Sequence, residues 1–313
     1  MATPGSPQGG LSLVELMVSI AVSAAVLSSL VYVYVSSRAA YRYNEALARI
    51  QEAGRFALEW ISRDLRQAGF MGCRSRGVTV DYFSNPKPTL LPGVSDPPVI
   101  GVIGYEDGAG FANPTTIARV GGDVLLLASL DGRTITPITQ DTSGESVSVV
   151  DNCAQFGVND VVVVSDCRRA VAVTVTARAN SRCGSGSGAT VLTHGAEKNS
   201  PSALPAFHAS GRAFVARLAT GSAGSPTTGY FIGSNRAGRP SLYRFAGAAA
   251  AEELVENIED LDLLFGVDTG GDGAVDSHLK ADAVADWSRV LSVRVSVLAV
   301  SGEAVGGSSG QVL

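Results

Sequence analysis

The feature that most constrains this chain is an apolar run near its N-terminus, from Leu11 to about Val35. Its only charged side chain is Glu15. As a helix this run would span roughly 37 Å, enough to cross a hydrocarbon core of about 30 Å. The run is longer than the apolar region of a secretory signal peptide, which has about 7–15 residues. A plain membrane anchor, in turn, has no use for a carboxylate. The sequence therefore predicts a membrane-spanning helix in which Glu15 has a role of its own.

The residues around Glu15 resemble the processing site of type IV prepilins and pseudopilins. Gly10 is followed by the stretch LSLVE, which runs from Leu11 to Glu15. In that family a prepilin peptidase cuts after the glycine, the new N-terminal residue is methylated, and a glutamate stands fifth in the mature chain. The resemblance implies a leader of residues 1–10 and a mature N-terminus at Leu11. This leader lacks the usual Lys or Arg, and its first mature residue is Leu where Phe is commoner.

The position of Glu15 has a physical interpretation. An ionised side chain at mid-membrane costs about 2.5–3.5 kcal/mol on insertion scales, so such residues usually have a partner. The amino group created at Leu11 would be one, either in the same chain or on a neighbouring subunit of a helical fibre. Pairing with a neighbour would set the register between subunits. The alternative is that Glu15 only reaches the cytoplasmic interface and stays hydrated.

Residues 36–69 continue the helical period but are amphipathic. The apolar positions are Tyr43, Leu47, Ile50, Ala53, Ala57, Ile61, Leu65 and Ala68, and the polar positions are Arg42, Glu45, Arg49, Glu52, Arg55, Glu59, Arg63 and Arg66. Glu45/Arg49 and Glu59/Arg63 are pairs in the favourable order, and Gly69 is a typical helix stop. The pattern predicts one helix over 11–69 whose second half packs on the chain's own sheet. A coiled coil is the alternative.

Residues 70–300 are expected to form a β-rich domain, and 301–313 a flexible tail. Strand-like runs alternate there with Gly, Pro, Asn and Asp. The expected strands are 78–83, 99–104, 123–129, 160–165, 170–176, 213–219, 230–234, 241–245, 254–265 and 288–300, with a hairpin turn at 236–239. The fold class predicted is α+β and pilin-like. A long N-terminal helix, membrane-spanning over 11–35 and amphipathic over 36–69, packs on an antiparallel β-sheet domain.

Segments spread over the body are similar, in the same order, to the minor pilins of the PilW family. They are Asp64–Cys73, Val164–Cys167, Ser241–Arg244, and Val255–Leu261 running into Gly266–Asp268. PilW proteins in turn resemble the J-type pseudopilin of type II secretion, a low-abundance subunit near the fibre tip.

This resemblance implies a minor pilin that is not an enzyme. It would be cleaved by prepilin peptidase and anchored once in the inner membrane lipid, with a periplasmic C-terminal domain. It would then enter the fibre and, with other minor pilins and the major pilin, prime or cap a type IV pilus. The alternatives are a type II secretion minor pseudopilin, a subunit for adhesion or DNA uptake at the pilus tip, and an unprocessed membrane-anchored domain.

Composition argues against several other classes of function. The net charge is −5 and only 17% of residues are charged, so a nucleic-acid partner is not expected. Familiar nucleotide-binding, hydrolase and zinc-protease motifs are absent. The stretches DTSG at 141–144 and DTG at 268–270 share their residues with the catalytic loops of aspartic proteases, but the sequences that flank them do not fit such loops. The three histidines, His194, His208 and His278, are expected at the surface.

The four cysteines are candidates for disulfides. Outside the cytoplasm Cys73, Cys153, Cys167 and Cys183 would form two bonds. Three pairings are possible. The closeness of Cys153 and Cys167 in sequence favours that pair, which leaves Cys73 with Cys183. Buried free thiols are the alternative.

One acidic loop is a weak candidate for calcium. Asp268, Asp272 and Asp276 recur every four positions among glycines. Calcium takes about 6–8 oxygen ligands, and three carboxylates with carbonyls and waters would serve. Gly270 stands where such loops usually carry a ligand. An acidic turn between strands is the favoured interpretation, and no other metal or cofactor is expected.

Overall fold

The computed structural model describes residues 12–70, 80–85, 101–142, 144–150, 156–166, 168–179, 189–219, 228–246 and 250–302. By its internal contacts the chain divides into two units. One comprises residues 1–51 with 301–313, and the other residues 52–300. Helix α1 (Leu13–Leu65) contributes its first part to one unit and residues 52–65 to the other.

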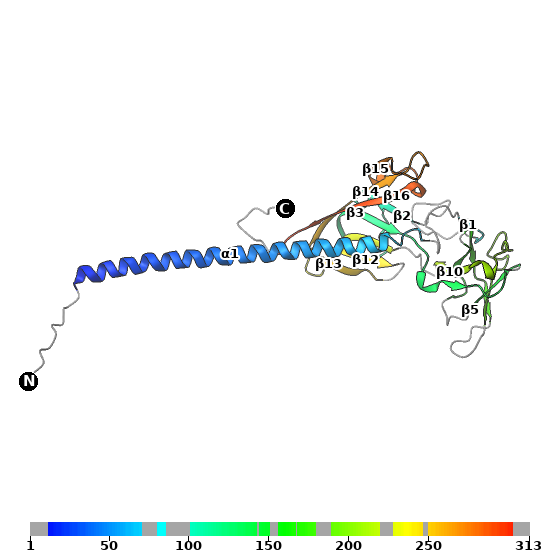
Figure 1. Cartoon of the computed structure of the whole chain (residues 1–313), viewed down its shortest axis with the longest axis horizontal. Coiled ribbons are helices and arrows are strands. Elements are labelled where there is room, and N and C mark those ends of the chain that lie inside the picture. The colour runs from blue at the N-terminus through cyan, green and yellow to red at the C-terminus, as the bar shows by residue number, and fades with distance from the viewer. Residues whose placement is uncertain are drawn as a thin grey trace, which may run out of the picture. The chain divides into compact units, whose positions relative to one another are not determined.

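Helix α1 is continuous over 53 residues, as Figure 1 shows in blue and cyan. Its first backbone bond runs from Leu16 N–H to the Ser12 carbonyl. Its end is set by Gly69, whose φ of 69° is left-handed, a conformation in which glycine carries no Cβ penalty. The Gly69 amide donates to the carbonyl of Ala128, which ties the helix end to the strand that precedes Ala128. The long helix expected from the periodicity is confirmed. Its regular part stops four residues before Gly69.

One five-stranded sheet has the order β1-β7-β6-β10-β4. Its strands are β1 (Val80–Tyr82), β4 (Thr136–Pro137), β6 (Val161–Ser165), β7 (Ala170–Thr174) and β10 (Phe214–Ala219). β1 pairs with β7 in parallel, and the other neighbours pair antiparallel. β6 and β7 are buried along their whole length and are rich in Val and Ala, as strands covered on both faces are.

A small antiparallel sheet lies beside it in the order β5-β9-β8. Its strands are β5 (Ser146–Val150), β8 (Ala177–Ala179) and β9 (Ala189–Thr193). An isolated bridge between Ile138 and Val149 joins the two sheets just after β4. The strands β4, β5, β8 and β9 were not expected from the sequence. All four are five residues or shorter, and Ser, Thr and Ala dilute their apolar pattern.

A second five-stranded sheet has the order β13-β12-β11-β3-β2. Its strands are β2 (Val102–Tyr105), β3 (Arg119–Leu127), β11 (Thr228–Ser234), β12 (Pro240–Ala246) and β13 (Glu252–Glu256). β11 and β12 form the expected hairpin. In its turn the Asn235 side chain accepts the amides of Ala237 and Arg239, and Gly238 has a φ of 74°.

A three-stranded antiparallel sheet has the order β15-β14-β16. It is formed by β14 (Ile258–Val267), β15 (Ser277–Leu279) and β16 (Val290–Ala299). Five short 3-10 turns lie between strands in the described part of the chain: Glu106–Gly108, Gly132–Thr134, Ala209–Gly211, Ala281–Ala283 and Trp287–Arg289.

The single strand expected over 254–265 is wrong, because the chain changes sheets within it. Asn257, with a φ of 60°, separates β13 in the five-stranded sheet from β14 in the three-stranded one. Asn is among the few residues with a side chain that tolerate this left-handed conformation. Its amide donates to Pro240, and its carbonyl accepts from Val300, so both backbone groups remain bonded.

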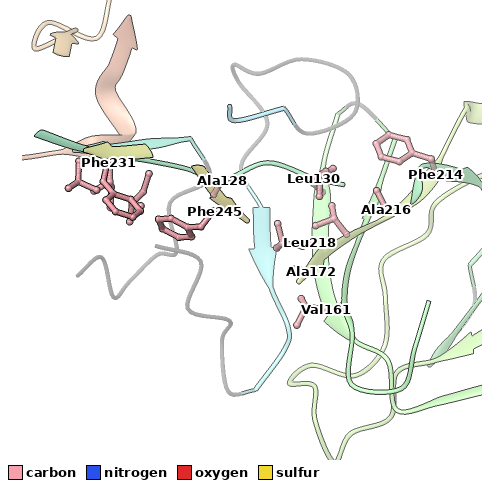
Figure 2. Close-up of a cluster of buried hydrophobic side chains, with 14 of the residues drawn as sticks. Ala128, Leu130, Val161, Ala172, Phe214, Ala216, Leu218, Phe231 and Phe245 are labelled. Atoms are coloured by element: carbon pink, nitrogen blue, oxygen red, sulfur yellow. The ribbon is translucent and has the colours of Figure 1, made fainter. Parts of the chain in front are cut away.

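The described part of residues 52–300 has three buried apolar clusters, and two of them include residues of the second five-stranded sheet. The first cluster joins that sheet to strands β6, β7 and β10 of the first five-stranded sheet. Figure 2 shows Phe231 and Phe245 at one end of this cluster and Phe214 and Leu130 at the other. The second cluster holds the helix: Ala57 and Ile61 are fully buried with apolar residues of β3, β11, β12 and β14. Burial of the expected apolar stripe at these positions confirms that the helix packs on the chain's own sheets.

Candidate assembly interface

The N-terminal turn of α1 carries Glu15, the residue singled out by the sequence. Its side chain is exposed, and its backbone carbonyl accepts from the Ser19 hydroxyl at 2.7 Å. A helix N-terminus carries a partial positive charge, so a carboxylate in the first turn is favoured there. Gly10 and Leu11 lie outside the described residues, as do Cys73, Cys153, Cys167 and Cys183.

The next turns of α1 present an apolar surface that nothing in the described chain covers. An 18-residue window of this helix has a mean hydropathy of 2.2, and no residue in that window is buried. The helix is long and apolar enough to span a membrane. Three of its serines use their hydroxyl groups within the helix. Ser19 and Ser29 bond to carbonyls one turn back at 2.7 Å, and Ser28 bonds in the same way to Ala24. Because these three hydroxyls have hydrogen-bond partners within the helix, they can be placed in hydrocarbon or against another protein.

Further along α1 the polar positions expected from the sequence are all exposed or half-buried. The Arg49 guanidinium and the Glu45 carboxylate form one of the two expected pairs, at 2.7 Å. The Arg63 guanidinium lies 4.8 Å from the centre of the Trp60 ring. Exposed pairs of this kind contribute only about 0.3–0.5 kcal/mol each. These contacts therefore add little to the stability of the helix.

The C-terminal end of α1 is fixed to the sheet by a polar contact. One carboxylate oxygen of Asp64 accepts from the Tyr230 hydroxyl at 2.6 Å and from Arg244 Nε at 2.8 Å. Burial, and then the Asp64 carboxylate, raise the pKa of Tyr230. For Arg244 burial lowers the pKa, but the Asp64 carboxylate outweighs it, so the net shift is upward. Tyr230 therefore stays protonated and Arg244 stays charged at all ordinary pH values.

A second buried carboxylate connects β3 to β14. Asp123 is 3% exposed, and its two oxygens accept the amides of Asp107 and Leu263, each at 2.8 Å. Burial raises the pKa of Asp123, and these two amides partly offset the shift. The contact places the three-stranded sheet against the five-stranded one. Neither Asp64 nor Asp123 was identified from the sequence. The signals that could have found them were a PilW-like segment around Asp64 and a lone carboxylate opening the apolar stretch of β3.

The acidic loop after β14 is held together by its own carboxylates. Asp268 accepts the amides of Gly271 and Gly273, and one oxygen of Asp276 accepts the amides of Thr269 and Gly270. Asp272 accepts from Ala274. In the part of the chain that the structure describes, no group of three or more His, Cys, Asp or Glu is arranged to hold a metal ion. This geometry is that of an acidic turn.

The other tempting residues also have structural roles. Asp141 is exposed and accepts from His208 Nδ1 and the Ala209 amide. His208 and His278 are exposed as expected. The expectation that His194 lies at the surface is wrong. It is 1% exposed, and its Nδ1 lies 2.8 Å from the Ser202 carbonyl. Its amide donates to the Glu145 carbonyl, so tertiary packing rather than local polarity determines its burial.

Comparison with protein-family models gives two matches. Residues 229–311 match the family described as type IV pilus-assembly protein W, PilW. Residues 5–31 match the prokaryotic N-terminal methylation motif. No curated protein and no solved structure matches the chain. The first match covers the strands from β11 to β16, and the second covers the start of α1 with Glu15. Strands β1 to β10 lie in neither.

Proposed function

Because the chain belongs to the PilW family of type IV pilus-assembly proteins and carries the prepilin methylation motif, we propose that it is a minor pilin that helps to prime and cap the pilus. The observation that carries the proposal is the combination of two parts in one chain. The apolar, unburied start of the helix lies within the methylation motif, and the same helix ends on a β-sheet body whose strands β11 to β16 match the PilW family. The family is structural, so the function is assembly rather than catalysis.

Processing comes first in this scheme. The motif implies that prepilin peptidase acts on the chain, and we place the cut between Gly10 and Leu11, with a methyl group added at Leu11. Before assembly the apolar part of α1 crosses the inner membrane once, with residues 70–300 in the periplasm. In that oxidising compartment Cys73, Cys153, Cys167 and Cys183 would form two disulfides.

Assembly follows when the apolar segment leaves lipid for a bundle of similar helices. The helix then exchanges contacts with lipid for contacts with other apolar helices, so its apolar side chains do little to set the register between subunits. Glu15 supplies it instead. An ionised carboxylate among apolar helices is stable only beside a cation, and the amino group at a neighbour's Leu11 is suited to that position. The β-sheet body then contacts other minor pilins and the major pilin.

The first test is the N-terminal residue and intact mass of the chain expressed with and without a prepilin peptidase. The proposal expects a start at Leu11 with one added methyl, only when the peptidase is present. Gly10→Val should block the cut, and Gly9→Val is the matched control that should leave it intact. A start at Met1 or Ala2 in both samples would show an ordinary membrane anchor and remove the basis for assembly.

The second test separates pilus assembly from its alternatives in a strain that lacks the chain. Loss of surface fibres and of twitching motility supports the proposal. Loss of exoenzyme export with normal fibres would instead identify a secretion pseudopilin. Normal fibres with lost adhesion or DNA uptake would identify a tip subunit with its own ligand. Complementation with the unprocessed Gly10→Val variant should fail in each case where the intact chain succeeds.

A further inference from the structure

The segment of α1 between its apolar start and its charged second half has an unusual composition. Four of the chain's eight tyrosines lie within twelve positions of each other: Tyr32, Tyr34, Tyr41 and Tyr43. All four are exposed, the least of them at 43%, whereas the other four are buried or half-buried within the β-sheet body. The same segment contains Arg38 and Arg42, which are the only charged residues between Glu15 and Glu45.

These six side chains cover an arc of about 200° around the helix axis, which is wider than a single stripe. At 100° per residue, Tyr32 and Tyr43 lie on one face, and Tyr34 and Tyr41 lie on the opposite face, about 200° away. Arg38 and Arg42 lie between these two faces on the same side of the helix, about 240° and 280° from Tyr32. A protein partner would contact one side of a helix. Phenol groups on opposite faces, with both guanidinium groups on the side between them, fit a lipid interface that contacts more than one face of the helix.

The spacing along the helix fits the same surrounding. Arg38 lies 23 residues after Glu15, and a rise of 1.5 Å per residue separates them by about 35 Å. A hydrocarbon core is about 30 Å thick, so both charges reach an interface when the residues between them fill the core. Tyrosine rings prefer the headgroup level, and arginine guanidinium groups extend to phosphate.

We infer that Tyr32, Tyr34, Arg38, Tyr41, Arg42 and Tyr43 form an interfacial belt. It binds the headgroup phosphates of the outer leaflet and fixes the depth of the precursor in the membrane. The inference rests on the proposed membrane-anchored precursor. It adds that the belt, and not only the length of the apolar run, sets where α1 leaves the lipid. The net charge of the belt is positive, which complements anionic phosphate.

The test measures the depth of one belt position in a bilayer. The full chain with Tyr34→Trp is reconstituted into vesicles of phosphatidylcholine and phosphatidylglycerol at about three to one. Its fluorescence is quenched by lipids brominated either near the headgroup or near the chain end. The chain with Tyr34 retained supplies the background from Trp60 and Trp287. The introduced tryptophan should be quenched mainly by the shallow bromines.

The deciding variant carries Tyr34→Trp and also replaces Arg38, Tyr41, Arg42 and Tyr43 by Leu. With the belt removed the apolar run lengthens, and the ratio of deep to shallow quenching of the introduced tryptophan should rise at least about two-fold. The matched control Arg49→Leu/Arg55→Leu loses two arginines outside the belt and should keep the original ratio. An unchanged ratio in the belt variant would overturn the belt while leaving the anchored precursor intact. If no brominated lipid quenched the introduced tryptophan, the anchored precursor itself would be overturned, and the belt with it.

Discussion

Asp64 in the last turn of α1 and Arg244 on β12 form an ion pair with 2.8 Å between the carboxylate oxygen and Nε. The two residues are 180 positions apart in the chain. Their side chains are 13% and 26% exposed, so solvent screens the pair only in part. The pair fixes the direction in which residues 52–65 cross the sheet, which a nonspecific apolar contact would not do.

Asp64→Ala should therefore destabilise the fold more than loss of a surface charge. It leaves Arg244 half-buried without its carboxylate and Tyr230 with only its longer bond to the Trp60 carbonyl, at 3.4 Å, a loss of about 2 kcal/mol after screening. We expect the midpoint of thermal unfolding of the full chain in detergent to fall by about 4–8 °C. Arg49→Ala, which breaks an exposed pair, should cost less than about 0.5 kcal/mol. In the double variant Asp64→Ala/Arg244→Ala the losses should be clearly less than additive, and full additivity would show that the pair is not coupled.

The apolar contact between α1 and the sheets can be tested at neighbouring positions of the helix. Ile61 is fully buried and Leu58 is 39% exposed. Ile61→Ala should cost about 2–4 kcal/mol because it removes buried methyl groups and leaves a cavity. Leu58→Ala, which deletes a side chain of equal volume, should cost under about 1 kcal/mol. Chemical unfolding of both variants measures the difference. Equal losses would contradict the packing of this face on the sheet.

His194 should make stability depend on pH in the acidic range. Burial lowers its pKa below the usual value of 6.5, although the Ser202 carbonyl opposes the shift. Between the lowered pKa and pH 6.5 the unfolded chain binds a proton that the folded chain does not. The free energy of unfolding is therefore unaffected by His194 above pH 6.5 and decreases as the pH falls below it. His194→Phe should reduce the difference in melting temperature between pH 7.5 and about 5. His208→Asn, at an exposed site, is the control. An undiminished pH effect in His194→Phe would assign it to other groups.

The acidic loop after β14 should be indifferent to calcium. The carboxylates of Asp268 and Asp276 already accept four loop amides between them. The bonds from Thr269 and Gly270 lower the pKa of Asp276, so it is ionised and bonded at neutral pH. We expect millimolar calcium or a chelator to change the melting temperature by less than about 1 °C. A saturable rise with calcium, lost in Asp272→Asn, would instead reveal a site.

Glu15 should be needed for entry into the fibre but not for cleavage. Glu15→Gln removes the charge and keeps the size, so the start at Leu11 should be retained. The amount of this variant in sheared fibres should fall about tenfold or more, the factor that corresponds to about 1.4 kcal/mol of lost pairing. Immunoblotting of the fibre and membrane fractions measures it, with Glu45→Gln as the matched control. Normal incorporation of Glu15→Gln would favour the alternative in which Glu15 is only hydrated at the interface.

The features that the sequence predicted well depend on short-range patterns. The helix follows from an unbroken period of three to four residues up to Gly69, and the β11–β12 hairpin follows from turn residues around Gly238. The family relation follows from the stretch ending in Glu15 and from the C-terminal segments, both of which match family models. In each case the residues that predict the feature lie within or next to the feature itself.

The features that the sequence did not predict depend on partners far along the chain. The strand over 254–265 reads as continuous, and only the hydrogen bonds of Asn257 to Pro240 and Val300 divide it between two sheets. Asp64, Asp123 and His194 look like ordinary polar residues until folding surrounds them. Their hydrogen-bond partners lie on β11, β12 and β14, in the 3-10 turn at Asp107, or in the loop at Ser202.

The sequence by itself determined the class of this protein, because a processing motif, an apolar run and a helical period are local and survive in any fold. Only the tertiary structure decided how residues 52–65 are held on the sheets and which carboxylates became buried. The physical reason is that burial and pairing are properties of contacts. The free energy of a charge such as that of Asp64 depends on whether Arg244 arrives beside it, and no local pattern records that.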